Sequence, residues 1–162
     1  MALGQSHDRA TIFWSIPFGL LISLPMGIIN GAISSLAFVL GGLWLSPDLD
    51  TRSIALKRWG MLRGLWWPYR KFMPHRSIFS HGPLIGTSLR VGYLVGWITV
   101  FFVLLQLLGV YELANSAIYI YEKVSTHHKA LLSLIIGLEG SAWLHLMQDG
   151  DPLPTEWRRW HN

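Results

Sequence analysis

The sequence has no cysteine among its 162 residues. This absence excludes disulfide bonds, thiolate nucleophiles, and zinc or iron–sulfur sites built from cysteine ligands. Charged residues are also scarce, at 14% of the chain against about 25% in a typical soluble domain. A composition so poor in charge and so rich in apolar residues excludes disorder, collagen and coiled coils.

The sequence is correspondingly rich in apolar residues. The hydrophobic fraction is 51% and the mean hydropathy is +0.37. These residues fall in blocks long enough to cross a bilayer, whose hydrocarbon core is about 30 Å thick. We therefore predict an all-α integral membrane protein, with residues 1–162 forming a single membrane domain.

The apolar blocks predict four transmembrane helices packed as a bundle. Residues 11–46 are almost wholly apolar or small, and one helix of that length would reach about 54 Å. The segment must therefore fold back, and the breakers from Pro25 to Gly31 mark the turn. Glycines such as Gly92 and Gly96 are expected to let the helices pack closely. The predicted helices lie at about 9–24, 27–46, 83–108 and 128–148.

Residues 47–80 form one long polar loop between the second and third predicted helices. Its basic residues are interleaved with tryptophan, a composition typical of a membrane interface. We expect short surface helices at about 53–65 and within 109–127. By the positive-inside rule, the loop and both termini lie in the cytoplasm. The loop's basic residues are Arg52, Lys57, Arg58, Arg63, Arg70, Lys71 and Arg76.

The net charge of +4 has two interpretations. In the first, the charge comes from basic residues that flank membrane helices. In the alternative, the positive charge attracts anionic lipid or phosphate substrates. Nucleic-acid binding is not predicted, because the basic residues lie among Trp and Pro beside membrane helices. The predicted location is a bacterial inner or thylakoid membrane. The lipid bilayer is the expected partner, and a larger membrane complex is a further candidate.

Histidine and aspartate gather at four places, each at the end of a predicted helix. In an up-and-down bundle these four ends meet at one membrane face. Imidazoles and carboxylates together suit zinc, manganese or iron, so we predict a metal site there. The set exceeds what one tetrahedral ion needs, so one or two ions are expected. It comprises His7, Asp8, Asp48, Asp50, His75, His81, His145 and Asp149.

Each of these residues alone has a simpler interpretation. A single His or Asp at a helix end often serves as a cap or as a solvated interface residue. Asp48, which follows Pro47, is a typical turn former. The coincidence of all four clusters on one predicted face favours the metal site. His127 and His128 fall on the other face and are excluded from it.

Two charged residues are predicted to lie inside the membrane. Arg90 is nine residues from His81, and Glu139 is ten residues from Asp149. Both therefore lie roughly 14 Å from the metal end. Because intramembrane charges are costly unless paired, we predict a structural Arg90–Glu139 ion pair.

The clustered motifs resemble those of small bacterial membrane proteins described as metal-binding, which are frequent in cyanobacteria. That group is similar to the broader membrane-bound metal-dependent hydrolases, and the resemblance covers residue 5 to about 160. The broader family usually spaces its two loop histidines five residues apart, whereas His75 and His81 are six apart. The matching elements are His7-Asp8-Arg9, Pro47-Asp48-Leu49-Asp50, His75-Arg76-Ser77 with Ser80-His81-Gly82-Pro83, and His145 with Asp149.

A remoter similarity, to zinc-dependent phospholipase C and related nucleases, implies specific ligands. They would be His7, one of Asp48 and Asp50, His75 or His81, His145, and Asp149 as a bridge between two ions. The similarity rests on residue order and type. With zinc as the expected metal, the candidate ligands are His7, Asp48, His75, His81, His145 and Asp149.

The leading functional hypothesis is a metal-dependent hydrolase. It would act on an ester or phosphoester, lipid or lipid-linked, at the cytoplasmic membrane face, with a water whose pKa the metal lowers toward about 7. An uncoordinated carboxylate would be the general base, with Asp8 and Asp50 as the catalytic candidates beside Asp48. The alternative is a non-enzymatic assembly factor or small subunit of a membrane complex, whose metal ties four helix ends together.

Arginines of the polar loop are the candidates for holding a substrate phosphate. A planar guanidinium matches phosphate oxygens in a bidentate manner. The candidates are Arg52, Arg70 and Arg76, and Arg52 and Arg76 are taken as the substrate-binding residues.

Overall fold

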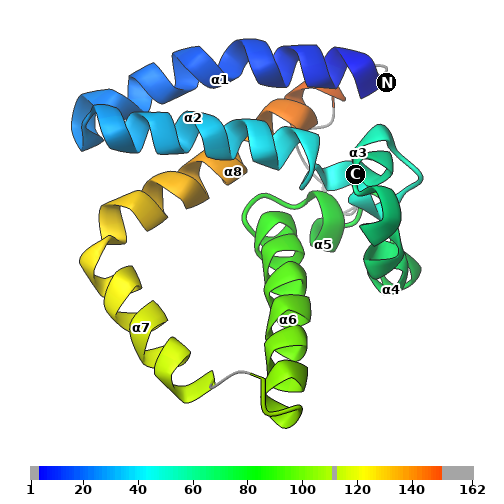
Figure 1. Cartoon of the computed structure of the whole chain (residues 1–162). Coiled ribbons are helices and arrows are strands. Elements are labelled where there is room, and N and C mark those ends of the chain that lie inside the picture. Colours follow the sequence, from blue (N-terminus) through cyan, green and yellow to red (C-terminus); the bar gives the residue numbers. More distant parts are fainter. Residues whose placement is uncertain (1–3, 111–112, 151–162) are drawn as a thin grey trace.

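The computed structural model describes residues 4–110 and 113–150, and within them every regular element is a helix (Figure 1). The predicted all-α class is therefore confirmed for this part of the chain. The polar tail from residue 151 onward lies outside the described residues. The elements are α1 Gly4–Met26, α2 Ile28–Leu43, η1 Pro47–Asp50, α3 Ile54–Arg58, η2 Gly60–Trp66, α4 Trp67–Phe72, α5 Ile78–His81, α6 Ile85–Leu107, α7 Leu113–Thr126 and α8 His128–Gln148.

Four segments are long and apolar enough to cross a membrane. They are Gly4–Met26, Ile28–Asp50, Ile85–Leu107 and His128–Gln148, with mean hydropathies of 1.3 to 1.8. Each one matches a predicted helix within a few residues. The main difference is at the start of α1, which begins at Gly4, so His7 lies inside the helix and not before it.

A single residue separates α1 from α2. The chain reverses at Gly27, whose φ of 87° lies in the left-handed region that glycine adopts without strain. Asn30 Nδ2 donates to the Met26 carbonyl at 2.7 Å, which satisfies a group at the end of α1. The predicted fold-back thus occurs at Gly27, while α1 continues through Pro17 and Pro25.

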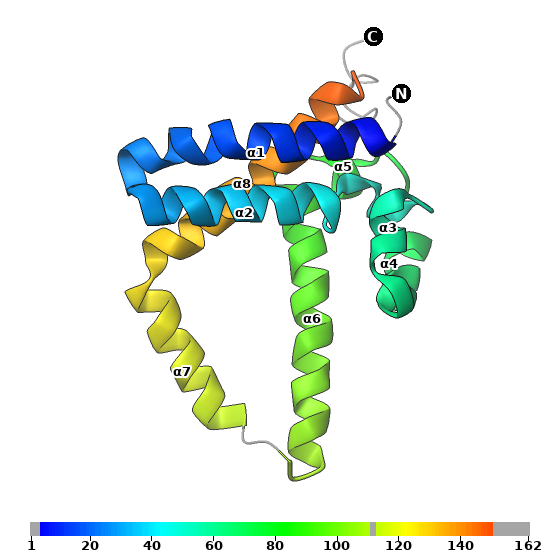
Figure 2. The same cartoon turned by 45° about the horizontal axis from the view of Figure 1, so that its top comes forward.

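The helices α1, α2 and α8 pack along one another, and the views in Figures 1 and 2 agree on this. Small residues make the close approach, since a Cβ on Gly137 would overlap the Ser34 carbonyl oxygen. On α1, a stripe at intervals of four residues is buried, namely His7, Thr11, Ser15 and Gly19.

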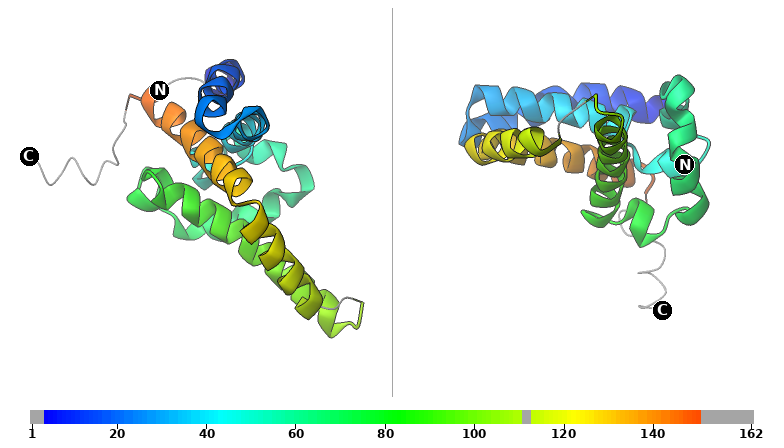
Figure 3. Two further views of the ribbon diagram at one scale, coloured as in Figure 1. Left: turned by 90° about the vertical axis from the view of Figure 1, so that its left-hand side faces the viewer. Right: turned by 60° about the horizontal axis from the view of Figure 1, so that its bottom comes forward.

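The helix α6 departs from the predicted four-helix bundle. It runs across the direction of α1 and α2, and α6 and α7 project together from the other helices (Figures 1 and 3). Gly86 does pack closely, against Ser80. Among the described residues, however, nothing lies within 4 Å of a Cβ built on Gly92 or Gly96, so the prediction that these two support packing is wrong. Hydropathy marks α6 as membrane-compatible but does not identify a packing partner.

The polar loop folds into a small helical lobe. Its core contains Leu49, Ala55, Leu56, Trp66 and Tyr69, all of which are buried. The surface helix expected at 53–65 is split into α3 and η2, because Gly60 has a φ of 54°. The lobe holds η1 and α5 beside the ends of α1 and α8, where the predicted metal residues lie.

Candidate metal centre

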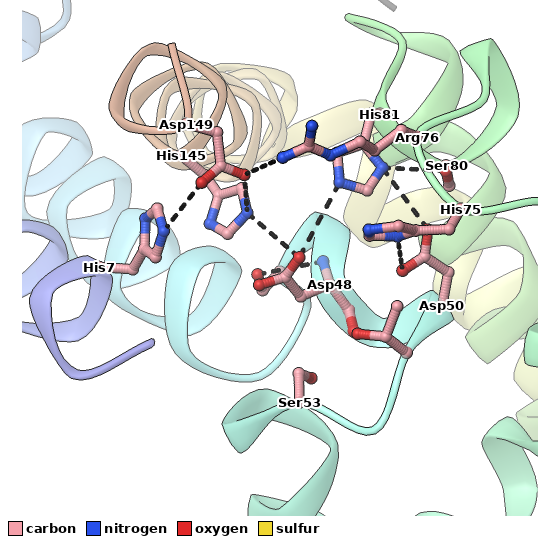
Figure 4. Close-up of polar contacts among 12 residues, drawn as sticks. His7, Asp48, Asp50, Ser53, His75, Arg76, Ser80, His81, His145 and Asp149 are labelled. Carbon is pink, nitrogen blue, oxygen red and sulfur yellow. Dashed lines mark hydrogen bonds and ion pairs between the residues drawn. The ribbon is translucent and has the colours of Figure 1, made fainter. Parts of the chain in front are cut away.

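Four segments bring the candidate ligands together (Figure 4). They are the start of α1, the short helix η1, the turn before α5 with α5 itself, and the end of α8. Local caps fix two of them, because the Ser46 hydroxyl accepts from Asp48 N and the Ser77 hydroxyl accepts from Ser80 N. His145 and Asp149 come from successive turns of one helix face.

One group of four donors has the arrangement of a metal site. Ligand atoms of Asp48, His81, His145 and Asp149 all lie within 4.8 Å of one another. His145 Nε2 is 3.5 Å from Asp48 Oδ1 and 3.5 Å from Asp149 Oδ2. His81 Nε2 is 3.9 Å from Asp48 Oδ1. Two imidazoles and two carboxylates therefore converge on one point.

The spacing of this group fits a shared ion better than direct hydrogen bonds. Nitrogen–oxygen hydrogen bonds are about 2.7–3.2 Å long. Ligand atoms about 2.1 Å from a tetrahedral ion would be separated by about 3.4 Å. Among the described residues, His81 Nε2 and His145 Nε2 are both buried and have no hydrogen-bond partner. An ion between the four donors would satisfy both nitrogens.

His81 presents its other nitrogen to a second group. Its Nδ1 lies 2.9 Å from the Ser80 hydroxyl and 3.6 Å from Asp50 Oδ2. Burial, and next the nearby His145, lower the pKa of His81 to about 3, so the imidazole is neutral at physiological pH. A neutral imidazole with its proton on Nδ1 has its Nε2 lone pair free to bind a metal.

Asp50, His75 and His81 form the second group of potential ligands. His75 Nδ1 lies 3.1 Å from each Asp50 oxygen. The Asp50 side chain is fully buried, whereas the His75 side chain is 44% exposed. Since the two groups share His81, Asp50 is placed to orient that imidazole as well as to bind an ion itself.

His7, a predicted ligand, lies outside both groups. Its Nε2 is 3.2 Å from Asp149 Oδ1, and its Nδ1 is 2.8 Å from Gln148 Oε1. Its ring stacks on that of His145 with centroids 4.2 Å apart. His7 therefore contacts two candidate ligands and is placed to fix their orientation.

Of the remaining predicted site residues, Arg76 lies at the centre, whereas Asp8 and Arg52 lie elsewhere. Arg76 Nη2 is 4.0 Å from Asp149 Oδ2, and the residue adopts a left-handed φ of 60°. Such strain in a residue with a side chain concentrates at functional sites. Asp8 forms an ion pair with Arg58. Arg52 lines a separate cavity in the helical lobe.

The predicted Arg90–Glu139 ion pair is not among the contacts of the described residues. Arg90 is 2% exposed and donates to the Ser80 carbonyl at 2.6 Å and to Thr87 Oγ1 at 3.1 Å. Glu139 Oε1 accepts from the backbone N–H of Leu84 at 2.8 Å. Arg90 therefore holds α5 at Ser80, next to His81, and Glu139 holds Leu84 in the α5–α6 connection.

The contacts of Ser80 and Gln148 are not evident from the sequence. Each lies next to a candidate ligand in the sequence, since Ser80 precedes His81 and Gln148 precedes Asp149. Each side chain contacts a site imidazole, at 2.9 Å and 2.8 Å respectively. Adjacency to a ligand was the available signal, but sequence alone does not tell which neighbour turns inward.

The fold and the site define a helical protein with four membrane-length segments and a His–Asp group suited to a metal ion. The family comparison agrees with this class, because residues 2–161 match the family described as uncharacterized metal-binding protein (DUF2227). The chain belongs to that family.

One curated relative is a protein of Aquifex aeolicus (strain VF5) described as uncharacterized. It is 42% identical over 60 residues. The match covers 36% of this chain and 42% of the relative, so it spans less than half of either protein. No solved structure matches the chain.

Proposed function

We propose that this protein is a membrane-embedded metal-dependent hydrolase that cleaves an ester or phosphoester at the cytoplasmic membrane face. The observation that carries the proposal is the group of Asp48, His81, His145 and Asp149, in which two buried imidazole nitrogens have no hydrogen-bond partner among the described residues. Membership of a metal-binding family supports an ion at this place. Four nitrogen and oxygen donors favour zinc, with manganese or iron as alternatives.

The residues around the four candidate ligands have different roles in the proposed reaction. A bound ion supplies Lewis acidity, which makes a water more acidic and stabilises charge on the leaving oxygen. Asp50 is buried and holds Nδ1 of His75, whose side chain reaches solvent. The Asp50–His75 pair can accept a proton at His75 Nε2. Asp8 is the weaker candidate for a general base, because its carboxylate already pairs with Arg58.

Arg76 supports a phosphate-bearing substrate. Its guanidinium is partly exposed and lies 4.0 Å from a candidate metal ligand, Asp149. An arginine in that position can bind two oxygens of a phosphate, which would leave a third oxygen for an ion held by the four donors. The left-handed backbone conformation at Arg76 sets the direction in which its side chain extends.

The four apolar helices and the basic loop support a membrane location. The loop between α2 and α6 holds seven Lys and Arg, which favours the cytoplasmic side for this loop and for the metal centre. Reporter fusions at residues 65 and 118 test this orientation. The fusion at residue 65 should report the cytoplasm, and that at 118 the opposite side. A reversed result would move the centre out of the cytoplasm.

The hydrolase proposal is tested with purified protein in neutral detergent. Its metal content is measured by elemental analysis, and hydrolysis of bis(p-nitrophenyl) phosphate and p-nitrophenyl acetate is followed. We expect metal-dependent hydrolysis of at least one substrate, lost in Asp48→Asn and retained in His127→Ala, which alters an exposed residue outside the site. Metal-loaded protein inactive on both substrates and on phospholipid vesicles would contradict the hydrolase proposal.

A second candidate function is a non-enzymatic protein in which the metal is structural. The observation in its favour is that the four donors come from three separate segments, η1, α5 and α8, which an ion would tie together. A closed shell of four protein ligands favours this role, and an open position favours hydrolysis. X-ray absorption spectroscopy of the metal-loaded protein distinguishes the two.

A further inference from the structure

The helical lobe contains a basic cavity that is separate from the metal-ligand groups. Its volume is about 380 Å³, which is within the usual range of small-molecule sites. Residues from the η1–α3 connection, α3, η2 and α4 surround it, and four of the six carry a positive charge. They are Arg52, Ser53, Leu56, Lys57, Arg63 and Arg70.

The positive charges around this cavity have no acidic partner in the described part of the chain. Within residues 4–110 and 113–150, none of the four basic side chains forms an ion pair with an acidic group. Four like charges around one space repel one another, and a bound anion removes that repulsion. Arg58, which follows Lys57 on α3, differs because it pairs with Asp8.

Arg70 provides a second and independent observation. Its Nε atom is buried and has no hydrogen-bond partner in the described part of the chain. A buried charged donor without a partner costs free energy, so such groups are normally satisfied. A small shift of the Arg70 side chain toward the cavity would bring this donor to a bound anion, and guanidinium groups bind phosphate oxygens at short distance.

The surface next to the cavity indicates where the anion comes from. The elements η2 and α4, which carry Arg63 and Arg70, also present large apolar side chains to solvent. The exposed fractions are 99% for Met61, 60% for Trp67 and 74% for Phe72. Cations beside exposed aromatic and aliphatic side chains are typical of a surface that enters the lipid headgroup layer.

We propose that this cavity binds the phosphate group of an anionic phospholipid headgroup. The apolar side chains of η2 and α4 enter the interface, and the cavity cations then receive the headgroup phosphate. This site anchors the lobe, and with it η1, at the membrane surface. The proposal does not depend on hydrolysis at the metal centre.

Titration calorimetry of the full-length protein in neutral detergent tests the proposal. The probes are a short-chain phosphatidic acid, the matching phosphatidylcholine and inorganic phosphate. Phosphatidic acid should bind more tightly than either other probe. Arg70→Gln and Arg63→Gln should each weaken its binding about tenfold, because each removes a charged donor to phosphate. Lys71→Gln is the matched control, since Lys71 is an exposed neighbour on α4 that does not line the cavity, and its effect should be below about twofold.

Three outcomes would overturn the proposal in whole or in part. Absence of binding to all probes removes the site altogether. Equal weakening by Lys71→Gln and Arg70→Gln shows attraction to general positive charge and not to a defined cavity. Inorganic phosphate binding as tightly as phosphatidic acid overturns the lipid as the source of the phosphate. An unchanged metal content and elution volume show that each variant is folded, and Arg63, which is exposed, can be replaced without disturbing the core.

Discussion

The imidazoles of His7 and His145 stack on each other, with ring centroids 4.2 Å apart and planes inclined by 28°. The stack joins the start of α1 to the end of α8, and His7 Nε2 also reaches Asp149 at 3.2 Å. One side chain thus contacts two candidate ligands. His7→Ala should weaken metal binding about 10–100-fold without abolishing it, which is typical for residues that orient ligands. Competition with a chelator measures the change.

The His7 prediction has two contrary outcomes. Complete loss of metal from folded His7→Ala protein would make His7 a ligand. Unchanged affinity would mean that the stack and the Asp149 contact do not orient the site.

Removal of a ligand should have a larger effect. His145→Ala or Asp149→Ala removes one of four converging donors, so bound metal should fall sharply in elemental analysis. His127→Ala and His128→Ala are matched controls, because both residues are exposed and lie at the other end of α8. If all four variants keep the metal content of the wild type, the ligand assignment is wrong.

Asp50 and Asp48 should respond differently to the same substitution. Asp48→Asn replaces a ligand candidate whose oxygen faces both His81 and His145, so metal should be largely lost. Asp50→Asn alters a residue that holds His75 and faces His81 Nδ1, so affinity should fall about 10–100-fold. Metal titration of both variants checks the difference. Equal losses would show that Asp50 also binds the ion in the wild type.

Glu139 should stabilise the fold through the α5–α6 connection. Glu139→Leu leaves the backbone N–H of Leu84 without its acceptor, and we expect a loss of about 1–3 kcal/mol in the free energy of unfolding. Glu139→Gln keeps an acceptor oxygen and should cost less. Thermal unfolding in detergent compares the two variants. Equal losses in the two variants would show that the charge, which both variants remove, and not the hydrogen bond, is what matters at this position.

The contact between α2 and α8 should be sensitive to a single methyl group. Gly137→Ala places a Cβ against the Ser34 carbonyl oxygen, so the backbones must separate at a cost of about 1–3 kcal/mol. Gly92→Ala is the control, because no described atom lies within 4 Å of the added Cβ. That variant should unfold at the same temperature as the wild type or slightly higher. Equal effects would argue against close packing at Gly137.

The sequence predicts the helices well and their packing less well. Long apolar runs are a strong local signal, so α2, α6 and α8 match the predicted ranges within three residues. The sequence does not distinguish Gly137 from Gly92. A Cβ on Gly137 would overlap the backbone of α2, whereas a Cβ on Gly92 would have no described atom within 4 Å. Close packing depends on the partner surface, and a single sequence contains no direct information about that partner.

The candidate site, too, can be predicted from the sequence only in part. Helix ends and residue types predict that the four segments meet. The up-and-down arrangement of α1, α2 and α8 brings three of them together, and the contact of α5 with η1 adds the fourth. The partner of each charge was not predictable. Arg90 and Glu139 were expected to bind each other, yet each binds a polar group of the segment 80–87. Backbone N–H and C=O groups compete for buried charges. Sequence patterns do not show which of these backbone groups lack a hydrogen-bond partner.

The glycine contacts between α2 and α8 determine how much of the metal site exists before an ion arrives. Gly41 meets Leu138 and Gly137 meets Ser34, so the backbones of the two helices fix the register between them. Asp48 follows α2 and His145 lies near the end of α8, so their relative position is set by rigid contacts. His81 instead comes from α5, on the opposite side of the site. His81 is also held in place without an ion, because Arg90 donates to the Ser80 carbonyl and the Ser80 hydroxyl contacts His81 Nδ1. The centre is thus preorganised from both sides, so metal binding carries a small entropy cost.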